Sequence, residues 1–261
     1  MEVIVTPTPE TAASAAASAV LAGLPAGKPP VLGLATGSSP LGLYAELAAA
    51  AAAARVDFSA AKGFALDEYV GLEAGHPQSY RQVLIHEVCD VIGLPLTGLN
   101  VPDGTGATDA ALKTGAAAYD AAIRAAGGVD VQVLGIGANG HVGFNEPGSS
   151  LSSRTRVKRL ASRTRRDNAR FFADEADVPT HCITQGLGTV LDARRLVLIA
   201  TGSAKAAPIA AAVEGPLSAS CPGSILQWHP DAVVVVDEAA AAGLANREYY
   251  DDAARGLALA L

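Results

Sequence analysis

The residues with the clearest capacity for chemistry are a histidine and a glutamate in one glycine-flanked loop. His141 lies five residues before Glu146 in the stretch 140–147. Imidazole titrates near neutral pH, and a carboxylate can fix its tautomer and raise its basicity. The pair is therefore a candidate acid–base relay. Metal ligation is less favoured, because the sequence has no HExxH motif and no second histidine near this loop.

A second candidate is Asp67, which follows the short apolar run 63–66. That run is typical of a buried strand. A partly desolvated carboxylate at a strand end can remove a proton from a carbon next to a carbonyl. Taken alone, residues 67–69 are more typical of a helix cap or a surface turn, so the catalytic interpretation depends on the rest of the site.

Two Thr-Gly-Ser loops suggest an anion site. Thr36, Gly37 and Ser38 follow one predicted strand, and residues 201–203, with Lys205 close behind, follow another. A glycine before a helix lets free N–H groups approach a ligand, and the helix dipole favours negative charge. Neither loop matches the Walker pattern. Ordinary helix capping by Ser or Thr is the alternative, but the repeat and the lysine favour phosphate or sugar binding.

Residues 135–140 fit GxGxxG and follow a predicted strand, so a dinucleotide enzyme is a rival interpretation. Gly143 and Pro147 would interrupt the helix that this motif requires. The acidic residue expected about 20 positions later is absent. That region is rich in arginine, which could accept the extra phosphate of NADP, so NADP binding stays open as an alternative.

The arginine-rich segment is a local exception in an acidic chain of net charge −7. Eight of the 19 Lys and Arg residues fall between positions 154 and 170: Arg154, Arg156, Lys158, Arg159, Arg163, Arg165, Arg166 and Arg170. Guanidinium groups suit phosphate. A solvated helix face is the alternative and accounts for about half of them.

The elements that must position these residues alternate along the chain. Apolar runs predict strands at 31–35, 63–66, 131–136, 196–200 and 233–236, and helices are predicted at 12–24, 40–55, 76–91, 109–126, 204–213 and 239–260. Such alternation predicts one α/β domain with a mostly parallel sheet and helices on both faces. Parallel strands end at one edge, where open α/β sheets bind ligands, so the candidate residues should converge there.

Composition limits the function classes. The chain has 261 residues, half of them apolar, which allows a sizeable core. The negative charge argues against binding nucleic acid or an anionic membrane. No apolar stretch is long enough to predict a membrane span, and residues 12–24 lack the basic start of a signal peptide. The three widely spaced cysteines fit a reducing cytoplasm, without a disulfide framework or zinc site.

Together these motifs resemble the glucosamine-6-phosphate deaminase family over nearly the whole chain. The matching segments are 32–40, 66–72, 76–77, 79–80, 135–147, 152–158 and 168–172. The related 6-phosphogluconolactonases share the Gly-His loop but typically differ where this chain has Phe144-Asn145-Glu146-Pro147. They also favour Asp-Glu-Arg where this chain has Asp67-Glu68-Tyr69.

The resemblance implies a Rossmann-like α/β fold in a single domain, 1–261, with a mobile lid at about 149–180. It implies deamination and isomerisation of glucosamine 6-phosphate to fructose 6-phosphate and ammonia in amino-sugar (N-acetylglucosamine) catabolism. Asp67 matches the base that moves a proton between C2 and C1, His141 the group that opens the pyranose ring, and Glu146 its relay partner. A small sugar phosphate would be the ligand, with no metal or cofactor required.

The resemblance also assigns binding residues. The substrate phosphate would be held by Thr36, Gly37, Ser38, Arg170 and Lys205. Some members are hexamers activated by N-acetylglucosamine 6-phosphate, and their effector site matches Ser149, Ser150, Arg156 and Lys158, so the resemblance allows a homo-oligomer. Asn139 stands where some members have aspartate. An asparagine can still accept a hydrogen bond from imidazole but adds no charge, so we expect the relay to depend more on Glu146.

Two further alternatives remain open on the sequence. A lactonase, or an isomerase of a related sugar phosphate, would release no ammonia from glucosamine 6-phosphate. A sugar-phosphate sensor on the same fold would keep its function when Asp67 is replaced by Asn, because a sensor needs binding and no proton abstraction.

Overall fold

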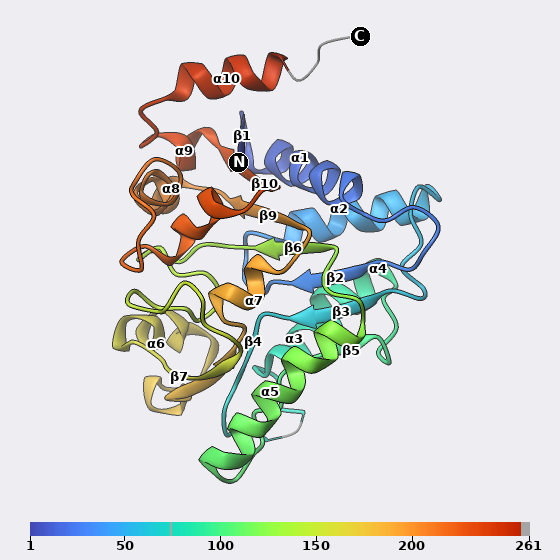
Figure 1. Cartoon of the computed structure of the whole chain (residues 1–261), viewed down its shortest axis with the longest axis vertical. Coiled ribbons are helices and arrows are strands. Elements are labelled where there is room, and N and C mark those ends of the chain that lie inside the picture. The colour runs from blue at the N-terminus through green and yellow to red at the C-terminus, as the bar shows by residue number, and fades with distance from the viewer. Residues whose placement is uncertain (74, 257–261) are drawn as a thin grey trace.

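A computed structural model describes residues 1–73 and 75–256 of the chain (Figure 1). Within them, seven strands form one parallel sheet. Their order across the sheet is β1 (Glu2–Thr6), β10 (Ala232–Asp237), β9 (Arg195–Ala200), β6 (Val131–Leu134), β2 (Val31–Leu34), β3 (Lys62–Ala65) and β5 (Leu99–Asn100). The predicted parallel sheet is confirmed, whereas β1 and β5 were not predicted.

The sheet is the core of the protein. Every residue of β2, β6 and β10 is buried, as expected for parallel strands covered on both faces. One continuous apolar cluster joins these strands to the helices on either side. The strand ends are therefore held rigidly, and the loops that follow them start from fixed positions.

Helices cover both faces, as predicted. Since α/β crossovers are right-handed, the strand order puts α1 (Pro9–Ala22), α2 (Leu41–Ala52), α3 (Tyr80–Leu84) and α4 (Asp90–Ile92) on one face and α5 (Asp109–Ala125), α7 (Leu187–Leu191) and α8 (Ala206–Val213) on the other. Contacts of α1 and α4 with α2 agree with this (Figure 1). The predicted helix 76–91 begins only at Tyr80, and it contains a π-helical turn, Ile85–Cys89.

A smaller antiparallel sheet, absent from the sequence prediction, lies beside the main one (Figure 1). It contains β4 (Asp67–Tyr69), β8 (His181–Thr184) and β7 (Arg156–Arg159). Around it lie α6 (Ser162–Asn168) and the short 3-10 turns Ala169–Phe171 and Glu175–Asp177. Asp67 therefore begins a strand of the second sheet, two residues after β3 ends. The cap-or-turn interpretation of residues 67–69 was wrong.

The predicted C-terminal helix 239–260 is broken into α9 (Glu238–Ala241) and α10 (Arg247–Gly256). The physical reason is Glu214, whose carboxylate accepts the backbone N–H groups of Ala245 and Asn246 at 2.7 and 2.8 Å. These amides no longer need helical partners. The rest of that prediction, 257–260, lies outside the described residues. None of the described helices is long and apolar enough to cross a membrane.

Candidate active site

The candidate residues converge at the carboxyl edge of the sheet, where β2 and β6 are neighbours. The connection that follows β2 runs over one face of the sheet. The connections that follow β6 run over the opposite face. This reversal of direction is the place where open α/β sheets bind ligands. The loop of Thr36, Gly37 and Ser38 starts from β2, and the loop of His141 starts from β6.

Glycines shape the His141 loop. Backbone hydrogen bonds close it, from the Gly137 N–H to the His141 carbonyl at 2.8 Å and from the Gly140 N–H to the Gly137 carbonyl at 2.9 Å. A Cβ at Gly137 would lie 2.1 Å from the His141 imidazole, so only glycine lets the ring lie against this backbone. A β-bridge and turns follow in place of a helix, which removes the structural context that the dinucleotide interpretation requires.

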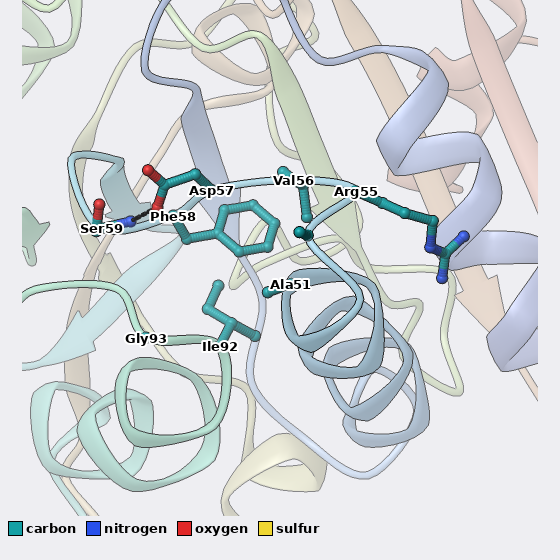
Figure 2. Close-up of a pocket in the computed structure, with 9 residues that line it drawn as sticks. Ala51, Arg55, Val56, Asp57, Phe58, Ser59, Ile92 and Gly93 are labelled. Carbon is teal, nitrogen blue, oxygen red and sulfur yellow. Dashed lines mark hydrogen bonds between the residues drawn. The ribbon is translucent and has the colours of Figure 1, made fainter.

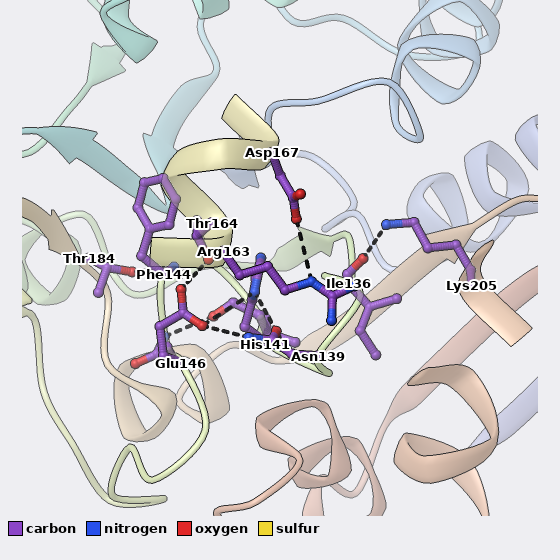
Figure 3. A network of polar contacts seen from close by, with 12 residues as sticks. Ile136, Asn139, His141, Phe144, Glu146, Arg163, Thr164, Asp167, Thr184 and Lys205 are labelled. Atoms are coloured by element: carbon purple, nitrogen blue, oxygen red, sulfur yellow. Dashed lines mark hydrogen bonds and ion pairs between the residues drawn. The ribbon is translucent and has the colours of Figure 1, made fainter. Parts of the chain in front are cut away.

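Asn139 lies between His141 and Glu146 (Figure 3). The amide oxygen is 2.7 Å from His141 Nδ1, and the amide nitrogen donates to Glu146 Oε2 at 2.7 Å. Because an amide oxygen only accepts, the imidazole carries its proton on Nδ1, and Nε2 is left for proton transfer. Glu146 Oε2 is 3.7 Å from Nδ1. Asn139 therefore connects the imidazole to the Glu146 carboxylate, and the dependence of the relay on Glu146 stays a prediction.

The surroundings of the relay adjust its proton affinity. Burial lowers the pKa of His141, the charge of Glu146 opposes that shift, and Lys205 adds to it. Glu146 is itself buried, and its Oε1 accepts a hydrogen bond from the Thr164 hydroxyl of α6. Asn145 holds the His141 loop in place, because its side chain donates hydrogen bonds to the carbonyls of Val142 and Gln185 at 2.9 and 2.8 Å.

Asp67 is buried beneath the same loop. A Cβ at Gly143 would lie 3.3 Å from Asp67 Oδ2, which places the carboxylate against the His141–Glu146 segment. Burial raises the pKa of Asp67 to about 8; the charge of Glu68 adds to the rise, and the backbone N–H of Phe144 opposes it. A carboxylate with such a pKa is a stronger base than an exposed one.

Glu68, next to Asp67, has a structural task. Its carboxylate accepts backbone N–H groups of Tyr69, Tyr80 and Arg81 at 2.8 to 2.9 Å. The last two belong to the first turn of α3, where helical N–H groups have no helical partner. Glu68 therefore anchors α3, and Asp67 is the neighbouring carboxylate that remains for chemistry.

The predicted phosphate residues lie near two helix starts. Gly37 and Gly202 have φ of +97° and +87°, a region that favours glycine. α2 and α8 begin without a side-chain cap, so the Ser/Thr capping interpretation does not apply to them. Free N–H groups at the start of α2 favour an anion, whereas the Gly202 N–H already donates to the Asp237 carboxylate at 3.0 Å.

Two predicted phosphate-binding cations, Lys205 and Arg170, lie close to each other. Lys205 is half-buried, and its Nζ donates to the Ile136 carbonyl at 2.6 Å (Figure 3). Burial lowers the pKa of Lys205, and the nearby charge of Arg170 lowers it further. The guanidinium of Arg170 lies over the Phe171 ring at 4.7 Å. Mutual repulsion of two cations at one place is relieved by a bound anion.

The predicted effector residues are less uniform. Arg156 and Lys158 share one face of β7, because they are two positions apart. Ser150 is exposed, whereas Ser149 is buried. Ser149 therefore does not present its hydroxyl at the surface together with the other three.

Sequence reasoning missed Thr164 and Thr184, which position the site. The Thr184 hydroxyl accepts the Phe144 N–H at 3.1 Å, and Thr164 holds Glu146 as described. Neither threonine belongs to a recognisable motif, and Thr164 lies within the arginine-rich segment that was interpreted as phosphate-binding or solvated. No sequence signal could have distinguished them from surface threonines.

Two hollows of about 590 and 690 Å³ lie elsewhere, and both are lined by Arg55, Val56 and Asp57. Figure 2 shows the smaller one. The lining of the larger hollow includes Pro30, directly before β2, and Ala60, two residues before β3, so it lies at the amino edge of the sheet. Neither hollow contains any of the predicted site residues. Across residues 1–73 and 75–256, no group of three or more His, Cys, Asp or Glu side chains is arranged to hold a metal ion.

Comparison with known proteins agrees with this geometry. Residues 7–235 match the family model described as glucosamine-6-phosphate isomerases/6-phosphogluconolactonase. A glucosamine-6-phosphate deaminase from Arthrobacter sp. (strain FB24) is 54% identical over 250 residues, covering 96% of this chain and 95% of that protein.

Solved structures show the same relationship. A monomeric glucosamine-6-phosphate deaminase superposes with a TM-score of 0.87 at 34% identity, covering 93% of this chain and 100% of that one. The 6-phosphogluconolactonase from Trypanosoma cruzi, with a TM-score of 0.73 at 18% identity over 94% of this chain and 97% of that one, shares the fold. The chain therefore belongs to the glucosamine-6-phosphate isomerase/6-phosphogluconolactonase family.

Proposed function

We propose that this protein is a glucosamine-6-phosphate deaminase, a hydrolase acting on a carbon–nitrogen bond, which converts glucosamine 6-phosphate to fructose 6-phosphate and ammonia. The observation that carries the proposal is the placement of the buried Asp67 carboxylate against a loop that holds a histidine relay. This reaction needs a base that removes a proton from carbon and an acid–base group that transfers a proton between oxygen atoms. Deaminases are the relatives of high identity.

His141 catalyses ring opening. Its Nδ1–H is held by Asn139, so Nε2 faces proton transfer. The imidazole moves a proton between O1 and the ring oxygen of the pyranose, and the open-chain aldehyde results. A lowered pKa keeps His141 neutral at physiological pH, which lets it begin as a base.

Asp67 catalyses the isomerisation. Its carboxylate takes the proton from C2 and returns it to C1, through an enolamine that tautomerises to the imine at C2. Water adds to this imine and ammonia leaves, which gives fructose 6-phosphate. The raised pKa of Asp67, about 8, makes its ionised form a stronger base toward the weakly acidic C–H bond, and the fraction of Asp67 in that form grows as pH rises toward 8.

The phosphate end fixes the sugar. Thr36, Gly37 and Ser38 lie before the uncapped start of α2, and Lys205 and Arg170 supply positive charge. Binding energy from the phosphate, which does not react, orients C1 and C2 over Asp67.

We further propose a single domain, 1–261, whose segment 149–180 acts as a lid, and a place for this protein in cytoplasmic amino-sugar (N-acetylglucosamine) catabolism. The lid proposal is supported by α6 of that segment, which lies over His141 and Glu146 (Figure 3). We also propose that several copies of the chain associate. The support is Trp228, a large apolar side chain that is 72% exposed. Light scattering would measure the mass of the assembly.

The test measures ammonia and fructose 6-phosphate released from glucosamine 6-phosphate by the wild type and by Asp67→Asn. Asn keeps the size of Asp but cannot accept the proton, so we expect turnover to fall by about 10²–10⁴-fold while sugar-phosphate binding persists. A folded wild type that releases no ammonia contradicts the proposal and favours a related sugar-phosphate enzyme or a sensor.

A further inference from the structure

The helix α6 has an unusual way of docking on the body of the protein. Its sequence, Ser162–Asn168, contains no apolar residue. Thr164 is its one buried side chain within the described residues, at 4% exposed. Apolar contacts are made by residues outside the helix, by Leu160 before it and Phe172 after it. The hydrophobic effect therefore holds the flanks, and the helix itself is placed by polar contacts.

The buried contact of α6 is made to the catalytic relay. The Thr164 hydroxyl donates to Glu146 Oε1, and Asn139 donates to Oε2 of the same carboxylate at 2.7 Å. Asn139 in turn accepts from His141 Nδ1 at 2.7 Å. A continuous chain of hydrogen bonds thus runs from α6 to the imidazole (Figure 3).

Each link of this chain depends on the one before it. Glu146 is buried, and a buried carboxylate that loses a donor must rotate or find another partner. If Glu146 turns, Asn139 loses the acceptor that holds its amide nitrogen. The amide can then flip, and its NH₂ group would face Nδ1 and favour the other imidazole tautomer.

We propose that Thr164 is a positioning residue that couples the docking of α6 to the tautomer of His141. The expected loss of turnover rests on the proposed function. The expected change in the His141 tautomer does not depend on it. When α6 is docked, Glu146 and Asn139 are held and Nε2 of His141 is ready. When α6 is displaced, the same hydrogen bond breaks, and ring opening loses its oriented acid–base group.

Thr164→Val tests this with little change of shape, because a methyl group replaces the hydroxyl. A hydrogen bond to a charged group contributes about 1.5–3 kcal/mol, so we expect kcat to fall about 10- to 100-fold. KM for glucosamine 6-phosphate should change less than about threefold, because the phosphate residues are untouched. Thr164→Ser keeps the hydroxyl and should keep kcat within about threefold of the wild type.

Thr189→Val is the matched control. Thr189 is also buried, and its hydroxyl also donates to a buried carboxylate, that of Asp120, at 3.1 Å. We expect it to leave kcat within about twofold. An equal loss in both Val variants would show that any buried threonine has this effect and would overturn the proposal.

A readout without turnover separates this inference from the proposed function. The ¹⁵N shifts of the His141 ring should show an Nδ1-protonated imidazole in the wild type and Thr164→Ser. They should show a mixture of tautomers in Thr164→Val. If the wild type releases no ammonia, the proposed function fails and these spectra still decide the coupling. Unchanged spectra in Thr164→Val overturn it, whatever the activity.

Discussion

At the scale of single residues, Asn139 shows how an uncharged side chain can serve a charged relay. Its oxygen accepts from His141 and its nitrogen donates to Glu146. An aspartate there would face Glu146 at the same distance, and two carboxylates so close do not both ionise. The amide avoids that conflict, since one of its ends suits the imidazole and the other suits the carboxylate.

The proposed phosphate site is tested at the same scale by Lys205→Met, which removes the charge and keeps most of the side-chain stem. We expect KM for glucosamine 6-phosphate to rise about 10- to 100-fold, because a hydrogen bond from an ammonium group contributes about 1.5–3 kcal/mol. The value of kcat should change much less. Steady-state kinetics measure both constants.

Lys113→Met is the control for this change, because Lys113 is an exposed lysine of α5 paired with Asp109. Its KM should equal that of the wild type. A KM for Lys205→Met that stays within twofold of the wild-type value would remove Lys205 from the phosphate site.

At the scale of elements, the segment 149–180 starts from a fixed base. Asp120 of α5 accepts from the Thr155 hydroxyl, from the Thr155 N–H at 3.3 Å and from Thr189, and Arg154 lies 3.4 Å from it. The start of α7 is joined to the same base by the Gly188 N–H, which donates to the Ser153 carbonyl at 2.9 Å. These contacts fix the proposed lid as far as Thr155, so a movement of that lid would begin after Thr155.

Gly186→Ala tests the close packing at this base. A Cβ there would lie 2.0 Å from the Ser153 carbonyl oxygen and 2.5 Å from that of Arg154. Both are backbone atoms, so the clash cannot be relieved by a side-chain rotation. We expect the free energy of unfolding to fall by about 3 kcal/mol or more, as urea denaturation would measure.

Gly115→Ala gives the opposite expectation and serves as control. Gly115 lies inside α5, and its nearest neighbour would be the Asp103 carbonyl at 3.9 Å. Alanine should therefore raise the free energy of unfolding by about 0.5–1 kcal/mol. Equal stability of the two variants would contradict the packing described for residues 153, 154 and 186.

At the scale of the whole molecule, the buried Asp67 makes stability depend on pH. Its folded-state pKa of about 8 lies above the ordinary value of 3.8. Between these values the folded protein holds a proton that the unfolded chain has released. Stability from this group is therefore full below about pH 4 and falls as pH rises toward 8.

Asp67→Asn removes this dependence, because asparagine does not titrate. We expect its Tm to match that of the wild type near pH 4 and to exceed it by about 3 °C or more at pH 8. For a domain of this size, 1 kcal/mol corresponds to roughly 2–4 °C. Calorimetry at both pH values measures the difference. A Tm gap that is the same at both would show that Asp67 is not buried in the protonated form.

The sequence by itself determined the family, the parallel sheet and the residues at its carboxyl edge. It could do so because local signals carry this information: apolar runs mark buried strands, and glycines mark the tight loops after them. Gly135–Gly140, His141 and Glu146 are close in the chain, so their grouping needed no tertiary knowledge.

Only the tertiary structure decided which partners these residues have. Asp67 entered a second sheet because β8, more than a hundred residues later, pairs with it. Glu146 meets Thr164 because α6 folds back over the loop, and α10 separates from α9 because Glu214 accepts its preceding amides. Each of these contacts joins segments that are distant in sequence, and burial makes their polar groups find partners that no local pattern reveals.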